Sequence, residues 1–100
     1  MPSCYIIGDV TVTDPERYKD YTAHTESTLA PFGGRFIVRG GAVERLEGDW
    51  EPGRVVVIEF PDQESARGWY ASEAYREILP IRLEASTGSL LLVEGYAGSS

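Results

Sequence analysis

Two stretches constrain the fold of this chain most, a glycine-bracketed segment at residues 33–41 and an almost continuous β-branched run at residues 55–60. β-branched and aromatic side chains favour strands, whereas paired glycines favour turns and bulges. The two stretches therefore predict a β-hairpin that is closed by a loop at residues 46–53. If the strands pair symmetrically about the middle of that loop, Arg39 lies opposite Glu59 on the same face. A bulge at Gly40-Gly41 would shift this register by one.

The remaining elements follow from apolar spacing and from helix-capping residues. Residues 4–12 predict a strand that is apolar on both faces. A helix is expected after Asp14, and its apolar stripe ends at Pro31 and the following glycines. A second helix begins after Asp62, restarts at Ser72-Glu73, is kinked or broken just before Pro80, and ends by Gly88. A last strand is predicted at residues 89–96, and residues 97–100 are expected to form a flexible tail.

The predicted order is β, α, β, β, α, β, which is typical of a ferredoxin-like α+β fold. It implies one domain over residues 1–96, with a four-stranded antiparallel sheet in the order 4-1-3-2 and the helices on one face. Three of the strands are apolar on both faces, so the uncovered face should be buried against another molecule. An identical copy related by two-fold symmetry is the simplest partner, and a homodimer is therefore predicted.

Charge and cysteine content limit the partners and the compartment. Nine Lys and Arg against sixteen Asp and Glu give the 100-residue chain a net charge of −7, which argues against nucleic acid and anionic membranes as partners. The first residues lack a basic region followed by a long apolar one, so neither a signal peptide nor a spanning helix is expected. A single cysteine cannot form an intrachain disulfide, which favours a cytoplasmic location.

Five stretches, read in order along the chain, resemble a family called domain of unknown function 1330 (DUF1330). They lie at residues 33–41, 46–50, 57–61, 69–75 and 92–95. The resemblance runs from Tyr5 to Gly95 and implies membership of the dimeric α/β-barrel superfamily, in which two sheets close into a barrel across a dimer. Relatives with that architecture include cofactor-free monooxygenases, muconolactone isomerases and chlorite-dismutase-like haem proteins. The family itself carries no agreed reaction.

Two charged residues and one histidine are candidate functional groups. Arg39 could hold a carboxylate or enolate in a pocket between sheet and helices, while Glu59 moves a proton. The alternative is a structural ion pair between these two residues. His24, the only histidine, could shuttle protons at the rim of the first helix, or it could simply be a solvated side chain.

Aromatic side chains could line the same pocket. Tyr18, Tyr21, Trp69 and Tyr70 suit a site for an aromatic ligand, although core packing at helical spacing is the favoured explanation. No metal-ligand cluster or cofactor motif is apparent, so no metal or cofactor is predicted. The leading hypothesis is a small-molecule-binding homodimer that, if an enzyme, acts as a cofactor-independent isomerase or monooxygenase. The alternative is a non-catalytic dimeric module.

Overall fold

The computed structural model describes residues 3–96, so the predicted tail at residues 97–100 lies outside the described part. Residues 3–96 form four strands and three α-helices, with a short 3₁₀ turn (Ala30–Phe32) after the first helix. In chain order the elements are β1 (Cys4–Val12), α1 (Pro15–Leu29), β2 (Arg35–Arg39), β3 (Arg54–Phe60), α2 (Gln63–Ala71), α3 (Glu73–Ala85) and β4 (Ser86–Glu94). Within residues 3–96, no helix has the length and apolar character needed to cross a membrane.

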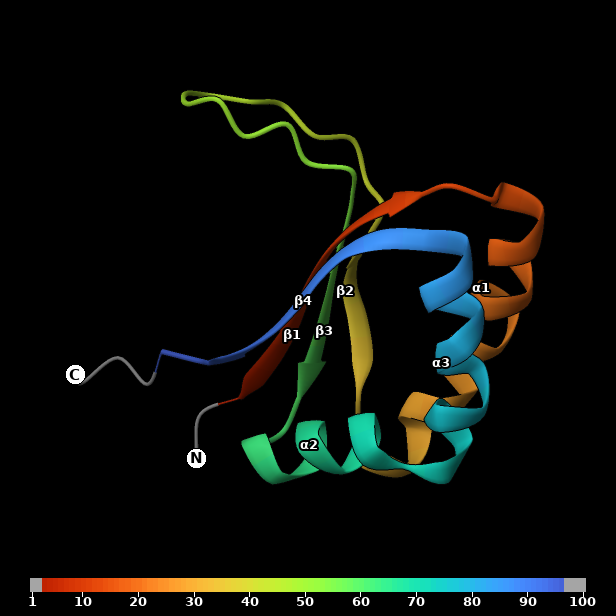
Figure 1. Ribbon diagram of the computed structural model, residues 1–100. Coiled ribbons are helices and arrows are strands. Elements are labelled where there is room, and N and C mark those ends of the chain that lie inside the picture. The colour runs from red at the N-terminus through yellow and green to blue at the C-terminus, as the bar shows by residue number, and fades with distance from the viewer. Residues whose placement is uncertain (1–2, 97–100) are drawn as a thin grey trace.

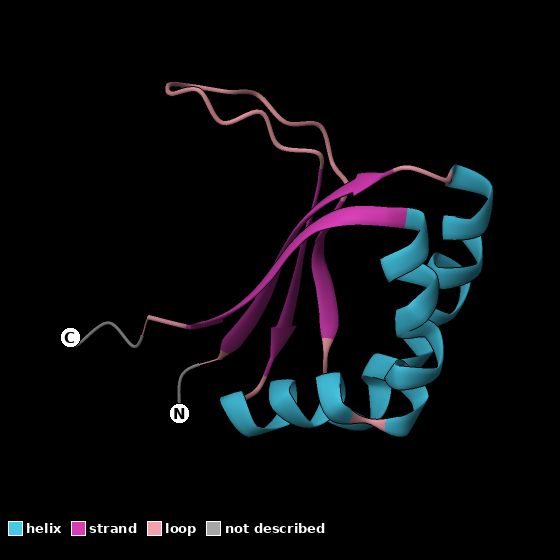
Figure 2. Cartoon of the chain, in the orientation of Figure 1, coloured by secondary structure: helices cyan, strands magenta, loops and turns pink. Residues whose placement is uncertain are grey.

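The strands form one antiparallel sheet in the order β2-β3-β1-β4, which confirms the predicted 4-1-3-2 order read from the other edge. Figures 1 and 2 show the helices on one side of this sheet. The core fills the space between the two layers, because alternate strand residues point toward the helices. Its largest fully buried side chains are Trp69, Tyr75, Phe60, Leu29 and Cys4.

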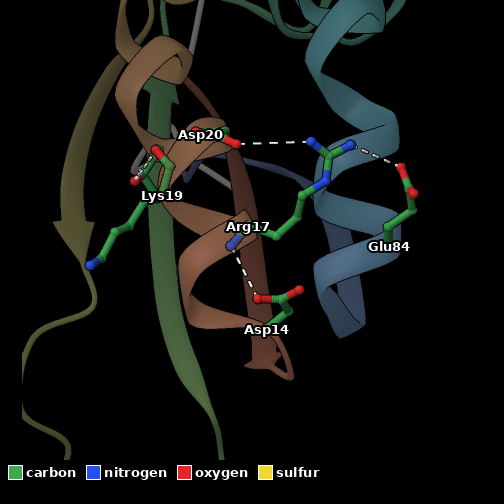
Figure 3. Close-up of polar contacts among 6 residues, drawn as sticks. Asp14, Arg17, Lys19, Asp20 and Glu84 are labelled. Atoms are coloured by element: carbon green, nitrogen blue, oxygen red, sulfur yellow. Dashed lines mark hydrogen bonds and ion pairs between the residues drawn. The ribbon is translucent and has the colours of Figure 1, made fainter.

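The helices begin at the capping residues that the sequence indicated. Asp14 and Asp62 each accept a hydrogen bond from a backbone N–H three residues later, and the Ser72 hydroxyl caps α3 in the same way. Arg17 links the two long helices at the surface, since its guanidinium lies 3.9 Å from Asp20 on α1 and 3.3 Å from Glu84 on α3 (Figure 3).

The second half of the chain differs from the prediction at Pro80 and at Gly88. Helix α3 continues through Pro80 to Ala85, because buried neighbours such as Leu79 and Ala85 hold it against the core despite the lost N–H donor. Strand β4 then begins at Ser86, and Gly88 lies inside the strand. Gly88 has a φ of 151°, and a side chain there would collide with the backbone carbonyl of Asp9.

The hairpin register also differs from the prediction. Arg35 pairs with Glu59, whereas Arg39 pairs with Val56, and a bulge at Ile37 separates the two parts of the ladder. The predicted pairing of Arg39 with Glu59 is therefore wrong, because the hairpin is not centred on Asp49 and the bulge lies within β2 rather than at the glycines. The correction places Arg39 on the helix side of the sheet and Glu59 on the opposite side.

The side of the sheet away from the helices, called here the open face, carries an apolar row across all four strands. Ile7 pairs with Val57 on one side and with Leu91 on the other, and Val57 pairs with Val38. Leu91 is 59% exposed. An antiparallel sheet with one solvated face usually presents polar residues there, so this row is an uncovered apolar surface.

The loop between β2 and β3, residues 40–53, projects beyond the sheet on the side away from the helices (Figure 1). The Asp9 carboxylate holds its base, because it accepts hydrogen bonds from the Trp50 indole at 2.9 Å and from the Gly53 backbone at 2.8 Å. Leu46, nearer the tip, is 88% exposed. The loop therefore adds apolar side chains to the same side of the molecule as the open face.

Candidate functional site

A narrow cavity of about 20 Å³ lies between the sheet and the helices, and it adjoins a shallow, open basin of about 510 Å³. Four residues line both spaces, namely Tyr18, Thr22, Arg39 and Arg54. The cavity has room for about one water-sized group, whereas the basin can accommodate a small molecule. The site is therefore a surface basin beside a small cavity that shares four of its lining residues.

Arg39 reaches the basin from the end of β2 and is held in place by three contacts. Its Nη2 donates to the Thr22 carbonyl at 3.1 Å, and its Nη1 lies 3.5 Å from Glu26 of α1. The guanidinium also lies 4.3 Å from the centre of the Phe36 ring, a cation–π contact. These contacts fix the orientation of the guanidinium plane at the wall of the basin.

Arg54, the first residue of β3, enters the same basin but has no anionic partner. It forms no ion pair within residues 3–96, and its buried Nε has no hydrogen-bond partner there. The guanidinium lies against the backbone of Gly40, where a side chain would collide with it, and 6.0 Å from the centre of the Tyr18 ring. A buried donor without a partner is costly, and protein atoms cover this nitrogen, so an oxygen ligand would reach it only after a shift of the Arg54 side chain.

Arg82 is a third arginine at the cavity, and its side chain is almost completely buried at 8% exposure. Its Nε donates to the Tyr75 hydroxyl at 3.2 Å, and that hydroxyl lies 2.9 Å from the hydroxyl of Tyr21. No carboxylate of the described chain pairs with it. Burial raises the pKa of Tyr21 and of Tyr18, so both phenols remain protonated near neutral pH.

The chemistry of these linings is that of an anion site. Three guanidinium groups meet at the cavity, and Glu26, which contacts Arg39, is the single carboxylate paired with any of them among the described residues. The lining residues of cavity and basin include no carboxylate, histidine or cysteine, and therefore no general base or nucleophile of those types. In the described part of the chain, no group of three or more His, Cys, Asp or Glu could hold a metal ion.

Four of the residues singled out from the sequence line the cavity, namely Tyr18, Tyr21, Arg39 and Trp69. Trp69 presents only carbon to it, because its indole N–H donates to the Thr28 hydroxyl at 2.9 Å. Tyr70 lies outside the cavity, where its ring is partly exposed and stacks with the guanidinium of Arg76.

The two predicted catalytic groups do not reach the cavity or the basin. Glu59 lies on the open face, where Arg35 donates to it from Nε at 2.9 Å and from Nη2 at 2.6 Å, and the Tyr5 hydroxyl donates at 3.2 Å. His24 is exposed on α1, and its imidazole has no hydrogen bond or ion pair within residues 3–96. The structure therefore separates Glu59 and His24 from the arginines.

The Glu59 cluster should make stability dependent on acid pH. Hydrogen bonds from Arg35, opposed by burial and assisted by Tyr5, hold the pKa of Glu59 below its ordinary value. Its contribution to stability is therefore fully present above the ordinary carboxyl pKa and is lost as the pH falls through the lowered one. Between about pH 5 and pH 3, the urea concentration at the midpoint of unfolding should therefore fall less in Glu59→Gln than in the parent. Glu47→Gln, which removes an exposed loop carboxylate without a hydrogen bond or ion pair in residues 3–96, is the control, and an equal reduction in both variants would contradict the role of the Glu59 cluster.

Arg54 and Arg82 were not singled out from the sequence, although a signal existed for each. Arg54 has the same strand parity as Val56 and Ile58, which places it on the helix-facing side of β3. Arg82 follows Tyr75 and Ile78 at helical spacing, so it belongs to the buried stripe of α3. The apolar neighbour of Arg82, Leu83, is 62% exposed.

Comparison with known proteins supports both the family and the fold. A family model described as "Domain of unknown function (DUF1330)" matches residues 3–96. No curated protein sequence matches the chain. Similar solved structures include the RPA0582 protein of unknown function from Rhodopseudomonas palustris, which is 17% identical, with 95% of this chain and 83% of that chain covered and a TM-score of 0.76.

Two further structures with the same fold have described or suggested activities. SnoaB, a cofactor-independent oxygenase from Streptomyces nogalater, is 17% identical over 99% of this chain and 98% of that chain, with a TM-score of 0.65. A putative antibiotic biosynthesis monooxygenase from Nitrosomonas europaea is 12% identical over 100% of this chain and 97% of that chain, also with a TM-score of 0.65. At these identities the likeness shows the fold alone.

Proposed function

Since this chain belongs to the DUF1330 family, whose function is unknown, we propose that it binds a small organic acid in the basin formed by β2, β3 and α1. The observation that carries the proposal is the pair of arginines at the basin, of which Arg54 has neither an ion pair nor a partner for its Nε in the described chain. Guanidinium groups match the planar geometry of a carboxylate. The rest of the chain is strongly acidic, so the basin is a local site of positive charge.

The remaining walls favour an acid with a flat, partly apolar body. Tyr18, Val12 and Pro15 offer apolar surface in the basin, and the hydroxyl of Thr22 already donates to the Lys19 carbonyl at 3.2 Å. A volume of about 510 Å³ lies within the range of ordinary ligand sites. Aromatic and keto acids of about a dozen heavy atoms are therefore the class of ligand that we propose.

If the bound acid is converted, cofactor-independent oxygenation is the reaction class that this lining supports best. With no carboxylate or imidazole among the lining residues, the substrate itself must ionise readily to an electron-rich anion, which the arginines would stabilise. The description of SnoaB as a cofactor-independent oxygenase is consistent with this class. Binding without conversion is the alternative, and ligand-dependent consumption of O₂ distinguishes the two.

The binding proposal predicts a large effect of removing either arginine of the basin. Arg54→Gln or Arg39→Gln should weaken the binding of phenylpyruvate, measured by isothermal titration calorimetry, about tenfold or more, because each loses a charged hydrogen bond. Arg45→Gln makes the same change of charge on the loop, at a residue that lines neither the cavity nor the basin, and should bind as the parent does. An equal loss in all three variants, or no binding by the parent at millimolar concentration, would overturn the proposal.

We also propose that a second copy of the chain covers the open face, so that the protein is a homodimer. The apolar row of Val38, Val57, Ile7 and Leu91 supports this, as does the loop at residues 40–53, which projects on the same side (Figure 1). A two-fold axis would pack the apolar row of one protomer against the same row of its partner, so that both partners bury the same apolar surface. A cytoplasmic location remains a prediction from the single cysteine, which is buried.

A further inference from the structure

The hydrogen bonds that connect Arg82, Tyr75 and Tyr21 have a direction that can be worked out from their surroundings. Arg82 can only donate, so the Tyr75 hydroxyl accepts its Nε–H at 3.2 Å. Tyr75 is completely buried and does not line the cavity, and its hydroxyl has one other partner in the described chain, Tyr21 at 2.9 Å. If Tyr21 donated to Tyr75, the hydrogen of Tyr75 would be buried without an acceptor, which is costly.

The opposite direction moves the unused hydrogen to Tyr21, which lines the cavity, where a bound group can accept it. When Tyr75 donates to Tyr21, every polar hydrogen of Tyr75 is used, and the hydrogen of Tyr21 is left over. Tyr21 lines the cavity, and its hydroxyl has no acceptor other than Tyr75 within residues 3–96. The chain therefore runs from Arg82 through Tyr75 to Tyr21 and ends with a donor at the cavity. A charged first donor strengthens each following hydrogen bond.

We propose that Tyr21 donates its hydroxyl hydrogen to a carbonyl or enolate oxygen of the bound acid, and that the natural ligand is therefore a keto acid or its enol. This inference rests on the proposed function, because the oxygen bound by Tyr21 belongs to the same ligand whose carboxylate the basin arginines bind. The volume of the cavity, about 20 Å³, admits one oxygen-sized group, while the carboxylate and the body of the ligand stay in the basin with Arg39 and Arg54.

The test compares two acids that differ only at the oxygen in question, phenylpyruvate and 3-phenylpropanoate. Measured by calorimetry, the parent should bind phenylpyruvate about five- to tenfold more tightly than 3-phenylpropanoate, which is the usual contribution of one hydrogen bond. Tyr21→Phe should bring this ratio close to one and leave the affinity for 3-phenylpropanoate within about twofold. If Tyr21 had only a structural role, Tyr21→Phe would weaken the binding of both acids by the same factor. Tyr70→Phe removes a phenolic hydroxyl outside the cavity and should preserve the ratio.

Tyr75→Phe tests the direction of the chain. It should lower the ratio of the affinity for phenylpyruvate to that for 3-phenylpropanoate, because the Tyr21 hydroxyl then loses the hydrogen-bond donor that polarises it. If Tyr21 instead donates to Tyr75, the variant frees the hydrogen of Tyr21 and the ratio rises, which would overturn the proposed direction. If the parent binds both acids equally and Arg54→Gln still weakens binding, this inference fails while the proposed function stands. If neither acid binds, both fail.

Discussion

Trp69→Ala is expected to lower the free energy of unfolding by about 3–5 kcal/mol, the usual cost of deleting a large buried aromatic side chain. Trp69 is 1% exposed, and its ring centre lies 4.1 Å from that of Tyr75 and 5.7 Å from that of Phe60. The substitution also leaves the buried hydroxyl of Thr28 without the indole donor. Because Trp69 joins α2 to both α3 and β3, the loss should affect the whole core and abolish ligand binding as well.

Trp50→Ala is the matched control, since the same side chain is deleted from a position that is 65% exposed. It loses one hydrogen bond to Asp9 and should cost about 1 kcal/mol. Urea unfolding followed by circular dichroism measures both variants, at one protein concentration because a dimer links stability to concentration. Comparable losses from the two substitutions would contradict the placement of Trp69 at the centre of the core.

Leu91→Asp is expected to weaken the proposed dimer by about two orders of magnitude or more, since an unpaired carboxylate would be buried in the interface. Leu91 lies at the end of the apolar row on the open face, where it pairs with Ile7. Because of the two-fold symmetry, each copy contributes one such carboxylate to the interface, which doubles the free-energy cost of burying them. Sedimentation equilibrium at neutral pH should show a dimer for the parent at micromolar concentration and a monomer for the variant.

Leu83→Asp provides the control for this experiment. Leu83 is 62% exposed and Leu91 is 59% exposed, so the two leucines are equally accessible in the single chain, but Leu83 lies on α3. The dimer should survive Leu83→Asp. A monomeric parent, or equal dissociation by the two variants, would exclude the open face as the contact surface.

The overall fold could be predicted from the sequence because its signals are local. Asp14, Asp62 and Ser72 mark helix starts through their own side-chain oxygens, and they cap the three helices in the structure. The β-branched run of β3 indicated a covered strand, and the order of the elements then left few possible topologies. Pro80 shows the limit of such rules, because packing of α3 against the core outweighs one missing hydrogen bond.

The candidate site was harder to predict because it depends on which face each side chain occupies. The bulge at Ile37 separated Arg39 from Glu59, and sequence periodicity alone does not show where a bulge will form. Arg82 was missed because a charged residue is not expected among the buried residues of α3, although it follows Tyr75 and Ile78 at helical spacing. Both errors concern residues whose charge conflicts with their buried or half-buried position, as is common at functional sites.

The bulge in β2 also determines how chain length can vary in this hairpin. Phe36 and Val38 pair with consecutive residues of β3, so Ile37 is the one residue of the strand that has no partner of its own. Deleting it would leave a regular ladder in which Val38 still faces Val57 and Arg39 still faces Val56. A one-residue deletion should therefore be tolerated at this point and nowhere else in the strand. When relatives are aligned, a gap opposite Ile37 preserves the assignment of each side chain to its face, whereas an ungapped alignment of a shorter β2 would assign the arginine to the wrong side.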